Sequence, residues 1–518
     1  MLECRRPRRD VMSVQGHPPP PTARPRCEAR TTGDVTVPTG SFAALDYMFH
    51  PGSVAIVGAS THEGPGSFLT AIREMKFEGA LYPVNPRAEE IQGLKCYPRL
   101  TEIPGDVDYV ISSVPLRFVE QLVEDCGVKR VKVLHFFTAG FSETGDDEAT
   151  ALEARVLARA RESGIRVIGP NCMGLYVPAA GLSFMPGLAP EPGPVAMLSQ
   201  SGANAGEFCR TAAARGLRYS KVVSYGNGTD VRESELLEYV AEDPDTTVVA
   251  SYIEGLTDGQ HFIRALRKAT AAKPVVILKG GRTEAGTRAA NSHTGSLAGS
   301  LQIFDAAVRQ GGAIRVDRME ELVDMAVTFR YLRELRGPRA GIVGGGGGYS
   351  VLASDEIGSA GLQMPALPEE IQRKLKDFTP TAGTSVRNPV DTNVGWGSEG
   401  LTAILDTIRI VAEAGNIDYV LYHTSWGHGP NRAGADEVVA TAKKQGAAIG
   451  ELAKEIGKPL VCVCRTPTSV DSMAATIAFQ DQCSEHELPV YSSVAAAALS
   501  LARFISWQSR RAAFAGAK

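Results

Sequence analysis

A single histidine among small, hydroxyl and basic residues is the strongest chemical signal in this sequence. His293 lies in the stretch Lys279–Ser300, which directly follows the apolar run Pro274–Leu278. Three basic residues precede it in this stretch: Lys279, Arg282 and Arg288. Glycine lets the backbone approach a ligand closely, and the cations favour negative charge. The pattern therefore predicts a loop that binds a phosphate or carries a phosphorylated histidine, with a plain surface loop as the alternative.

Two further strand ends have residues suited to the same chemistry. The strand Pro194–Leu198 runs into Ser199–Gly206 and then into a helical stretch, a hydroxyl–glycine–helix pattern that is typical of an anion cradle. The alternative is an ordinary serine N-cap. The strand within Thr247–Gly255 ends on Glu254, which could accept the second ring N–H of His293 and fix its tautomer. A solvated loop glutamate is the alternative there.

The amino-terminal part of the pattern looks like a nucleotide-binding opening. A β-branched strand in Ser53–Ser60 ends in a glycine turn, and a helical pattern follows over Phe68–Met75. The glycine spacing departs from G-x-G-x-x-G. The second strand, Gly79–Val84, ends in Asn85, where an NAD site would offer Asp or Glu. A dehydrogenase is therefore only an alternative interpretation.

Strands and helices alternate along the rest of the chain, which predicts parallel, doubly wound sheets. Two turns at strand ends, Thr138–Ser142 and Gly169–Gly174, place small hydrogen-bonding residues where open α/β sheets bind ligands, although a tight turn is the simpler interpretation of each. The pattern breaks at Gly337–Pro338 and restarts with a strand and five glycines, Gly344–Gly348. No Gly-Lys-Ser/Thr follows, which argues against a P-loop, and the role of the run stays open.

Composition narrows the class of protein. The chain has 518 residues, 43% hydrophobic and 22% charged, and a net charge of −4, which argues against a nucleic-acid partner. Nine scattered cysteines favour a reducing cytoplasm and predict no metal site; Cys462 and Cys464 fit a core strand. We find no apolar run long enough for a spanning helix and expect no membrane partner.

Residues 1–45 predict a disordered tail, with a transit peptide or a later start at Met12 or Met48 as alternatives.

One block of residues carries a family resemblance. Ser292–Gly299, with Gly281–Gly286 before it, resembles the phosphohistidine loop of the NDP-forming acyl-CoA synthetases. From about Phe49 onward the chain is similar to the alpha subunit of ADP-forming acetate–CoA ligase and, more distantly, to that of succinyl-CoA synthetase. The resemblance implies an α/β protein: a Rossmann-like CoA-binding domain (46–180) and two flavodoxin-like parallel-sheet ligase domains (190–336 and 338–510). The five-glycine run departs from the family pattern.

The resemblance also implies roles for single residues. His293 would be the phosphorylated nucleophile and Glu254 its partner. The residues expected beside the phosphoryl group are Ser199, Ser201, Gly202, Thr294 and Gly295. The residues expected near CoA are Gly58, Ser60, Asn85, Pro86, Arg87 and Asn171. No protein-bound metal is expected in this chain.

The implied reaction joins a carboxylic acid to CoA through phosphohistidine and acyl phosphate, with ATP or ADP and Mg²⁺ held by a separate ATP-grasp beta subunit, because three α/β units account for the whole chain. A non-catalytic CoA-binding scaffold or regulator is the main alternative, and an NAD-dependent oxidoreductase a further one. The sequence does not reveal the acid, the choice of ADP or GDP, or the oligomeric state.

Overall fold

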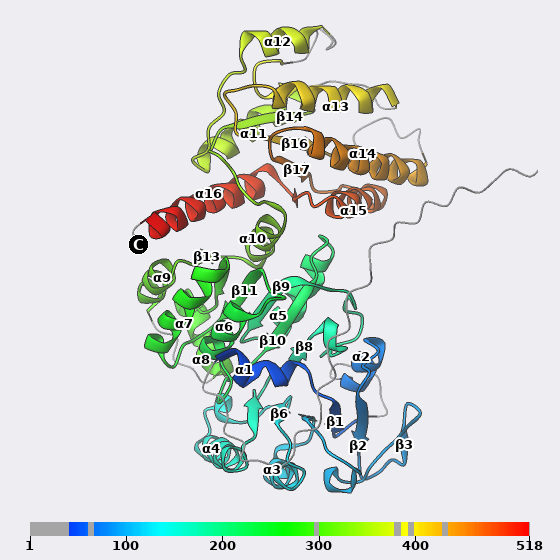
Figure 1. The fold of residues 1–518 in the computed structure, drawn as a ribbon, viewed down its shortest axis with the longest axis vertical. Coiled ribbons are helices and arrows are strands. Elements are labelled where there is room, and N and C mark those ends of the chain that lie inside the picture. Colours follow the sequence, from blue (N-terminus) through cyan, green and yellow to red (C-terminus); the bar gives the residue numbers. More distant parts are fainter. Residues whose placement is uncertain are drawn as a thin grey trace, which may run out of the picture. The chain divides into compact units, whose positions relative to one another are not determined.

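The computed structural model describes residues 41–60, 67–294, 300–377, 385–391, 398–426 and 434–516. Within these ranges the chain forms three sheets with helices between their strands, which confirms the predicted α/β class (Figure 1). A two-stranded hairpin, β3 (Glu90–Ile91) and β4 (Leu94–Lys95), is separate from the three sheets.

The first sheet is entirely parallel, in the order β2-β1-β5-β6-β7. Its strands are β1 (Ser53–Val57), β2 (Ala80–Val84), β5 (Tyr109–Ser112), β6 (Val133–Phe136) and β7 (Arg166–Ile168). Its helices are α2 (Phe68–Glu74), α3 (Val119–Val128) and α4 (Asp147–Glu162). β2 lies on one side of β1 and β5 on the other, so the direction in which strands are added reverses at β1. Open α/β sheets bind ligands at such a switch point.

The second sheet has the order β13-β12-β11-β9-β10-β8, and only β8 is antiparallel. Its strands are β8 (Gly174–Tyr176), β9 (Pro192–Ser199), β10 (Tyr219–Ser224), β11 (Val248–Ile253), β12 (Val275–Lys279) and β13 (Ile314–Val316). Its helices are α5 (Gly202–Ala213), α6 (Glu233–Glu242), α7 (Gly259–Ala272), α8 (Glu284–Thr294), α9 (Leu301–Gln310) and α10 (Met319–Tyr331).

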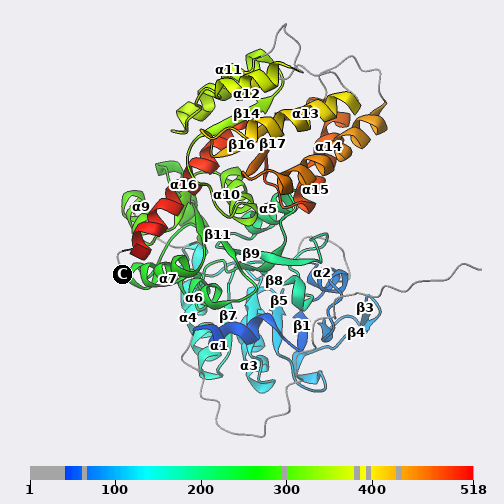
Figure 2. The same cartoon turned by 45° about the horizontal axis from the view of Figure 1, so that its top comes forward.

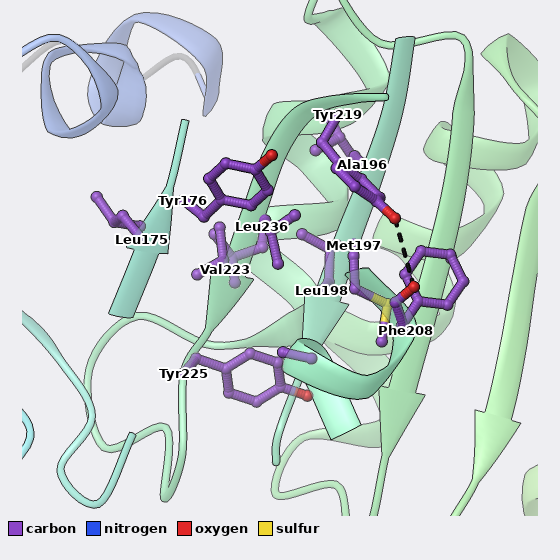
Figure 3. Packing of buried hydrophobic residues seen from close by; sticks show 14 of the residues in the cluster. Leu175, Tyr176, Ala196, Met197, Leu198, Phe208, Tyr219, Val223, Tyr225 and Leu236 are labelled. Atoms are coloured by element: carbon purple, nitrogen blue, oxygen red, sulfur yellow. Dashed lines mark hydrogen bonds between the residues drawn. The ribbon is translucent and has the colours of Figure 1, made fainter. Parts of the chain in front are cut away.

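Strand β8 lies in the region expected to form the first domain, yet it pairs with β10 of the second sheet. The reason is packing, because Leu175 and Tyr176 are buried in the core that the second sheet shares (Figure 3). In that core the Tyr219 hydroxyl donates to the carbonyl of Phe208 at 3.3 Å. A buried phenol needs such a partner to offset its desolvation.

The third sheet is parallel, in the order β15-β14-β16-β17-β18. Its strands are β14 (Ala340–Gly344), β15 (Val390–Asp391), β16 (Tyr419–Thr424), β17 (Leu460–Cys464) and β18 (Val490–Tyr491). Its helices are α11 (Gly347–Ser359), α12 (Glu369–Lys376), α13 (Ser398–Ala412), α14 (Ala435–Glu455), α15 (Val470–Glu485) and α16 (Val494–Gly516). Helices α14 and α15 lie side by side (Figures 1 and 2). Cys462 and Cys464 are buried in β17, which confirms a core strand.

The described structure begins before residue 45, the expected end of the tail. Helix α1 (Ser41–Leu45) and the 3₁₀ turn η1 (Asp46–Phe49) pack on α6 through Tyr239. The rings of Phe42 and Phe49 stack on the Tyr239 ring, and its hydroxyl donates to Asp46 at 2.9 Å. Three aromatic rings bury enough apolar surface to order this short segment. Residues 1–40 lie outside the described ranges.

Within the described ranges, no helix combines the length and the apolar character needed to cross a membrane.

Prediction 1 concerns a buried ion pair between β10 of the second sheet and the end of α6. The Lys221 ammonium lies 2.8 Å from Asp243, and each side chain is 2% exposed. Changing Asp243→Asn leaves a buried cation with a weaker acceptor, so we expect a loss of about 3–5 kcal/mol of unfolding free energy. Urea denaturation measures it. The control Glu451→Gln removes an exposed partner of Lys454 and should leave the urea midpoint unchanged.

Candidate active site

The stretch around His293 folds as a helix where a loop was expected. Helix α8 spans Glu284–Thr294, and His293 falls in its last turn. The Thr283 hydroxyl accepts the Gly286 N–H at 3.1 Å, and Arg288 pairs with Glu284 one turn away at 2.8 Å. A capped, alanine-rich run with an i,i+4 ion pair favours helix over loop. The side chains of His293 and Thr294, and all of Gly295, lie outside the described residues.

The three cations before His293 all have partners within the chain, and their binding of an anion stays a prediction. Lys279 is only 3% exposed and donates to the backbone carbonyls of Glu254, at 2.6 Å, and Gly280. Burial lowers the pKa of the Lys279 ammonium, and the Glu254 carboxylate partly opposes that shift. Arg282 pairs with Asp317. These cations hold the strand ends in place.

Glu254 follows β11 and is buried, with its backbone and side chain both engaged. The Gln200 side-chain oxygen accepts the N–H of Glu254 at 2.7 Å and of Gly255 at 3.1 Å. The Glu254 carboxylate accepts a hydrogen bond from the Tyr252 hydroxyl. Burial and this carboxylate together raise the pKa of Tyr252. A Cβ at Gly280 would lie 2.5 Å from the Tyr252 oxygen, so this close approach requires glycine. The carboxylate is therefore fixed at the strand end.

The predicted phosphate cradle is the beginning of α5. The Ser201 hydroxyl caps the helix by accepting the Asn204 N–H at 3.3 Å, so the N-cap interpretation is confirmed for Ser201. Ser199 donates to the Ser201 carbonyl at 2.6 Å, and both serines are buried. Gly202, the first helical residue, has Met173 packed against it so closely that a side chain would not fit. Contact of these residues with a phosphate stays a prediction.

The predicted CoA residues cluster at the switch point of the first sheet. Gly58 has φ +89°, and a Cβ there would lie 2.7 Å from the Ser113 carbonyl oxygen. The Asn85 amide donates to the Ala59 carbonyl at 2.8 Å and so ties β2 to the turn after β1. Its oxygen accepts the Arg87 N–H at 2.9 Å. Ser60, Pro86 and Arg87 are exposed at this edge. A hydroxyl and a guanidinium there fit a phosphate group.

Loops from the first and second sheets meet around Asn171. Asn171 adopts φ +57°, and its N–H donates to the Thr138 carbonyl at 3.1 Å. The Asn227 N–H donates to the Pro170 carbonyl at 3.0 Å. Helix α8 lies against η4 (Ser142–Thr144), which follows β6. The structure thus groups Glu254, α5 and α8 on the second sheet and the CoA candidates on the first, with Asn171 where their loops touch.

Sequence reasoning missed a third polar group, at the carboxyl edge of the third sheet. Helix α11 starts at Gly347 after Gly346, which has φ +100° and donates its N–H to Asp391 at 2.9 Å; no side chain caps the helix. The buried Ser350 hydroxyl has no hydrogen-bond partner among the described residues. The five consecutive glycines were the one sequence feature that pointed to this group, but they did not predict which side chains surround the turn.

His423 and Arg465 complete this third group. His423 is 1% exposed, and within the described ranges neither ring nitrogen has a hydrogen-bond partner. Its ring packs directly on Gly344, which explains why a glycine ends β14. The Arg465 guanidinium stacks 3.6 Å from the Tyr349 ring centroid and donates to Ser425 at 2.7 Å; its Nε and Nη1 are buried without an acceptor in the described part of the chain. Such a set of donors suits an oxyanion.

Three family models match consecutive regions of the chain. A CoA binding domain covers residues 52–178, a succinyl-CoA ligase like flavodoxin domain covers 192–329, and a ligase-CoA domain covers 340–508.

Curated relatives and a solved structure agree with these matches. The acetate–CoA ligase [ADP-forming] II subunit alpha of Pyrococcus furiosus is 40% identical over 348 residues, which cover 67% of this chain and 76% of that protein. The acetate–CoA ligase [ADP-forming] of Methanocaldococcus jannaschii is 39% identical over 348 residues, 67% of this chain and 49% of that protein. The dinucleotide forming acetyl-coenzyme A synthetase 1 of Ca. Korarchaeum cryptofilum, solved with phosphate and ADP, superposes with a TM-score of 0.75 at 30% identity, covering 90% of this chain and 97% of that one.

The chain therefore belongs to the NDP-forming acyl-CoA synthetases, the acid–thiol ligase family that includes the ADP-forming acetate–CoA ligases. It spans about half the length of the Methanocaldococcus relative and about three quarters of the Pyrococcus alpha subunit.

Prediction 2 concerns His423. Burial, with a smaller contribution from Arg465, lowers the pKa of His423 to about 4 from its ordinary 6.5. Between these values the unfolded chain takes up a proton that the folded chain does not, so stability falls as the pH drops from 6.5 towards 4. His423→Gln should remove about 1 kcal/mol of the stability loss between pH 6 and pH 5.

Urea titrations of the two proteins at pH 7, 6 and 5 measure this effect. His50→Gln, at an exposed histidine, should keep the wild-type pH dependence. An unchanged pH dependence in His423→Gln would contradict the prediction.

Proposed function

We propose that this chain is the alpha subunit of an NDP-forming acyl-CoA synthetase that joins a carboxylic acid to CoA through three group-transfer steps. ATP phosphorylates the imidazole of His293 and leaves as ADP. The imidazole then passes the phosphoryl group to the carboxylate of the acid, which forms an acyl phosphate. The thiol of CoA then displaces phosphate from the acyl phosphate, forming the thioester and releasing inorganic phosphate. Run in reverse, the same steps phosphorylate His293 from acyl-CoA and phosphate.

The observation that carries this proposal is the fixed carboxylate of Glu254 on the sheet edge from which α8 departs. β11 and β12 are hydrogen-bonded neighbours, so Glu254 follows one strand and the stretch that leads to His293 follows the next. A buried carboxylate beside an imidazole fixes its tautomer and stabilises the positive charge that develops on phosphorylation. The start of α5 supplies backbone N–H groups for the phosphoryl oxygens, through Ser199, Ser201 and Gly202, with Thr294 and Gly295 as further candidates.

CoA is proposed to lie along the first sheet. Gly58, Ser60 and Asn85–Arg87 would hold its nucleotide part, and Asn171 would lie near the path to the second sheet. The CoA binding domain match over residues 52–178 supports this. The domain boundaries that we propose are 46–180, 190–336 and 338–510, with β8 crossing over to complete the second sheet.

The nucleotide is proposed to act on a separate chain. One relative is itself a subunit alpha, and another has about twice the matched length in a single chain. An ATP-grasp beta subunit holding ATP or ADP with Mg²⁺ accounts for both facts. A small carboxylic acid is the other substrate, and the donors around Arg465, His423 and the start of α11 suit its carboxylate or the phosphoryl group that it receives.

Prediction 3 tests the phosphohistidine. Incubated with acetyl-CoA and inorganic phosphate, the wild-type chain should gain one phosphoryl group that is lost in acid, because a phosphoramidate is acid-labile. His293→Ala should gain none. The control is His261→Ala. His261 lies on α7, 3.0 Å from Glu238, and this variant should gain as much phosphate as wild type.

Intact-mass spectrometry before and after acid treatment measures the gain. If no phosphoryl group appears on wild type with a panel of acyl-CoAs while CoA still binds, the chain is a CoA-binding scaffold and the proposal fails.

Prediction 4 tests Glu254. Glu254→Gln keeps the size and one hydrogen-bond acceptor but removes the charge, so the rate of His293 phosphorylation should fall by roughly 10²-fold with CoA affinity retained. The matched control is Glu238→Gln, which also removes a carboxylate beside a histidine and should leave the rate within about twofold. Quenched-flow sampling with phosphate analysis gives both rates. Equal rates for the two variants would exclude a role for the Glu254 charge.

A further inference from the structure

Glu143 makes a polar contact between the first two sheets that the proposed chemistry does not use. It lies in η4, just after the Thr138–Ser142 turn that follows β6. One carboxylate oxygen accepts the N–H of Gly140 at 2.5 Å, within its own loop. The other accepts the side-chain amide N–H of Asn227 at 2.7 Å, from the turn that follows β10 in the second sheet. One carboxylate therefore bridges two loops that come from different sheets.

The Asn227 turn offers little freedom to move away from this contact. Gly226 and Gly228 on either side adopt φ +54° and φ +61°. Gly226 packs so closely on the carbonyl of Pro170 that no side chain would fit, and the Asn227 N–H donates to that same carbonyl at 3.0 Å. The backbone of the turn is thus anchored, and its amide side chain is presented to the carboxylate of Glu143.

A second carboxylate supports the same loop from its other end. Glu153 on α4 accepts the Ser142 hydroxyl with both oxygens at 2.9 Å and the Ser142 N–H at 3.3 Å. The Asn227 amide reaches Glu153 only at 3.4 Å. The short contact of Asn227 is with Glu143, which makes Glu143 the bridging residue and Glu153 a brace for the η4 loop.

The bridged loop supports the helix that carries His293. Helix α8 lies against η4, so the position of η4 sets part of the surface on which α8 rests. Both Glu143 oxygens already accept hydrogen bonds, so this carboxylate is well suited to hold its neighbours in place. Hydrogen bonds to an ionised group in a partly buried position are stronger than those between neutral groups.

We propose that Glu143 is a positioning residue for the transfer between CoA and His293: by joining the loop after β6 to the turn after β10, it holds α8 in the orientation that the reaction requires. The purpose of the bridge rests on the proposed function. The bridge itself, and its effect on α8, do not depend on that function and are measured separately below.

The test exchanges donor and acceptor across the bridge. Glu143→Gln can keep its oxygen towards the Gly140 N–H, but it then points an N–H at Asn227. The charge-assisted hydrogen bond is lost, and the Asn227 amide must turn over to offer its oxygen instead. Adding Asn227→Asp returns an acceptor to that position and restores the bridge with its polarity reversed, but only in part, because the new carboxylate also lies near Glu153. The single change Asn227→Asp would instead place two carboxylates together, and these repel. Glu148→Gln, an exposed residue at the start of α4, is the matched control for the loss of one charge.

Hydrogen exchange of the whole chain is the first readout, because it needs no activity. We expect Glu143→Gln to speed exchange of the amides in residues 284–290 by roughly tenfold, with the third sheet unchanged, and the double variant to return part of that protection. Glu148→Gln should match wild type. Unchanged exchange in α8 for Glu143→Gln, or a double variant as fast as the single one, would overturn the proposal.

The second readout connects the bridge to chemistry. With acetyl-CoA and phosphate, Glu143→Gln should phosphorylate His293 roughly tenfold more slowly than wild type, with the dissociation constant for CoA within about twofold and recovery in the double variant. A parallel loss of CoA affinity would make Glu143 a CoA-binding residue and overturn the positioning role. If wild type itself is not phosphorylated, the proposed function fails, and the hydrogen-exchange result alone decides whether the bridge holds α8.

Discussion

The buried ammonium of Lys279 is the constraint on which the candidate site depends. It ends β12, and its donors reach the carbonyl of Glu254 at the end of β11 and that of Gly280 in its own turn. A buried cation without acceptors would be costly, so these two strand ends must stay together once the sheet forms. The Phe304 ring, 5.5 Å from the ammonium, adds a favourable face from α9. The backbone that presents the Glu254 carboxylate is thereby held in place.

Gln200 completes this arrangement from the third neighbouring strand. Its side-chain oxygen accepts two successive N–H groups, those of Glu254 and Gly255, and its backbone N–H donates to the Tyr252 carbonyl at 3.0 Å. β9, β11 and β12 are adjacent in the sheet, so one glutamine and one lysine satisfy backbone groups that a bare strand end would leave exposed. The start of α5 immediately follows Gln200, which couples the proposed anion cradle to the same network.

The first two sheets share more structure than consecutive domains usually do. β8 leaves the first region to pair with β10, and the loops after β6, β7 and β10 exchange hydrogen bonds through Pro170, Asn171 and Asn227. Arg166 at the start of β7 adds an ion pair with Asp230 at 2.8 Å and one with Glu235 at 2.7 Å, both from the second region. Residues from two sheets can therefore be held to the tolerance that the proposed phosphoryl and thiol transfers need.

The sequence by itself determined the alternation of strands and helices, the glycine turn at Gly58, the capped start of α5 and the block around His293 that resembles a phosphohistidine loop. These are local signals, because a period of apolar residues, a cap or a left-handed glycine is set by neighbours in the chain. The same local signals misled at α8, where glycines and cations predicted a loop, although Ala289, Ala290 and the Arg288–Glu284 pair favour helix.

Only the tertiary structure decided which partners the charged and polar side chains find. Lys279 meets the carbonyl of Glu254, Glu143 meets Asn227, and His423 and Arg465 gather beside the five-glycine turn, each across a long separation in sequence. Such contacts depend on strand order, and strand order depends on the packing of whole faces. The pairing of β8 with the second sheet is the clearest case, because its three residues do not determine which sheet buries Leu175 and Tyr176.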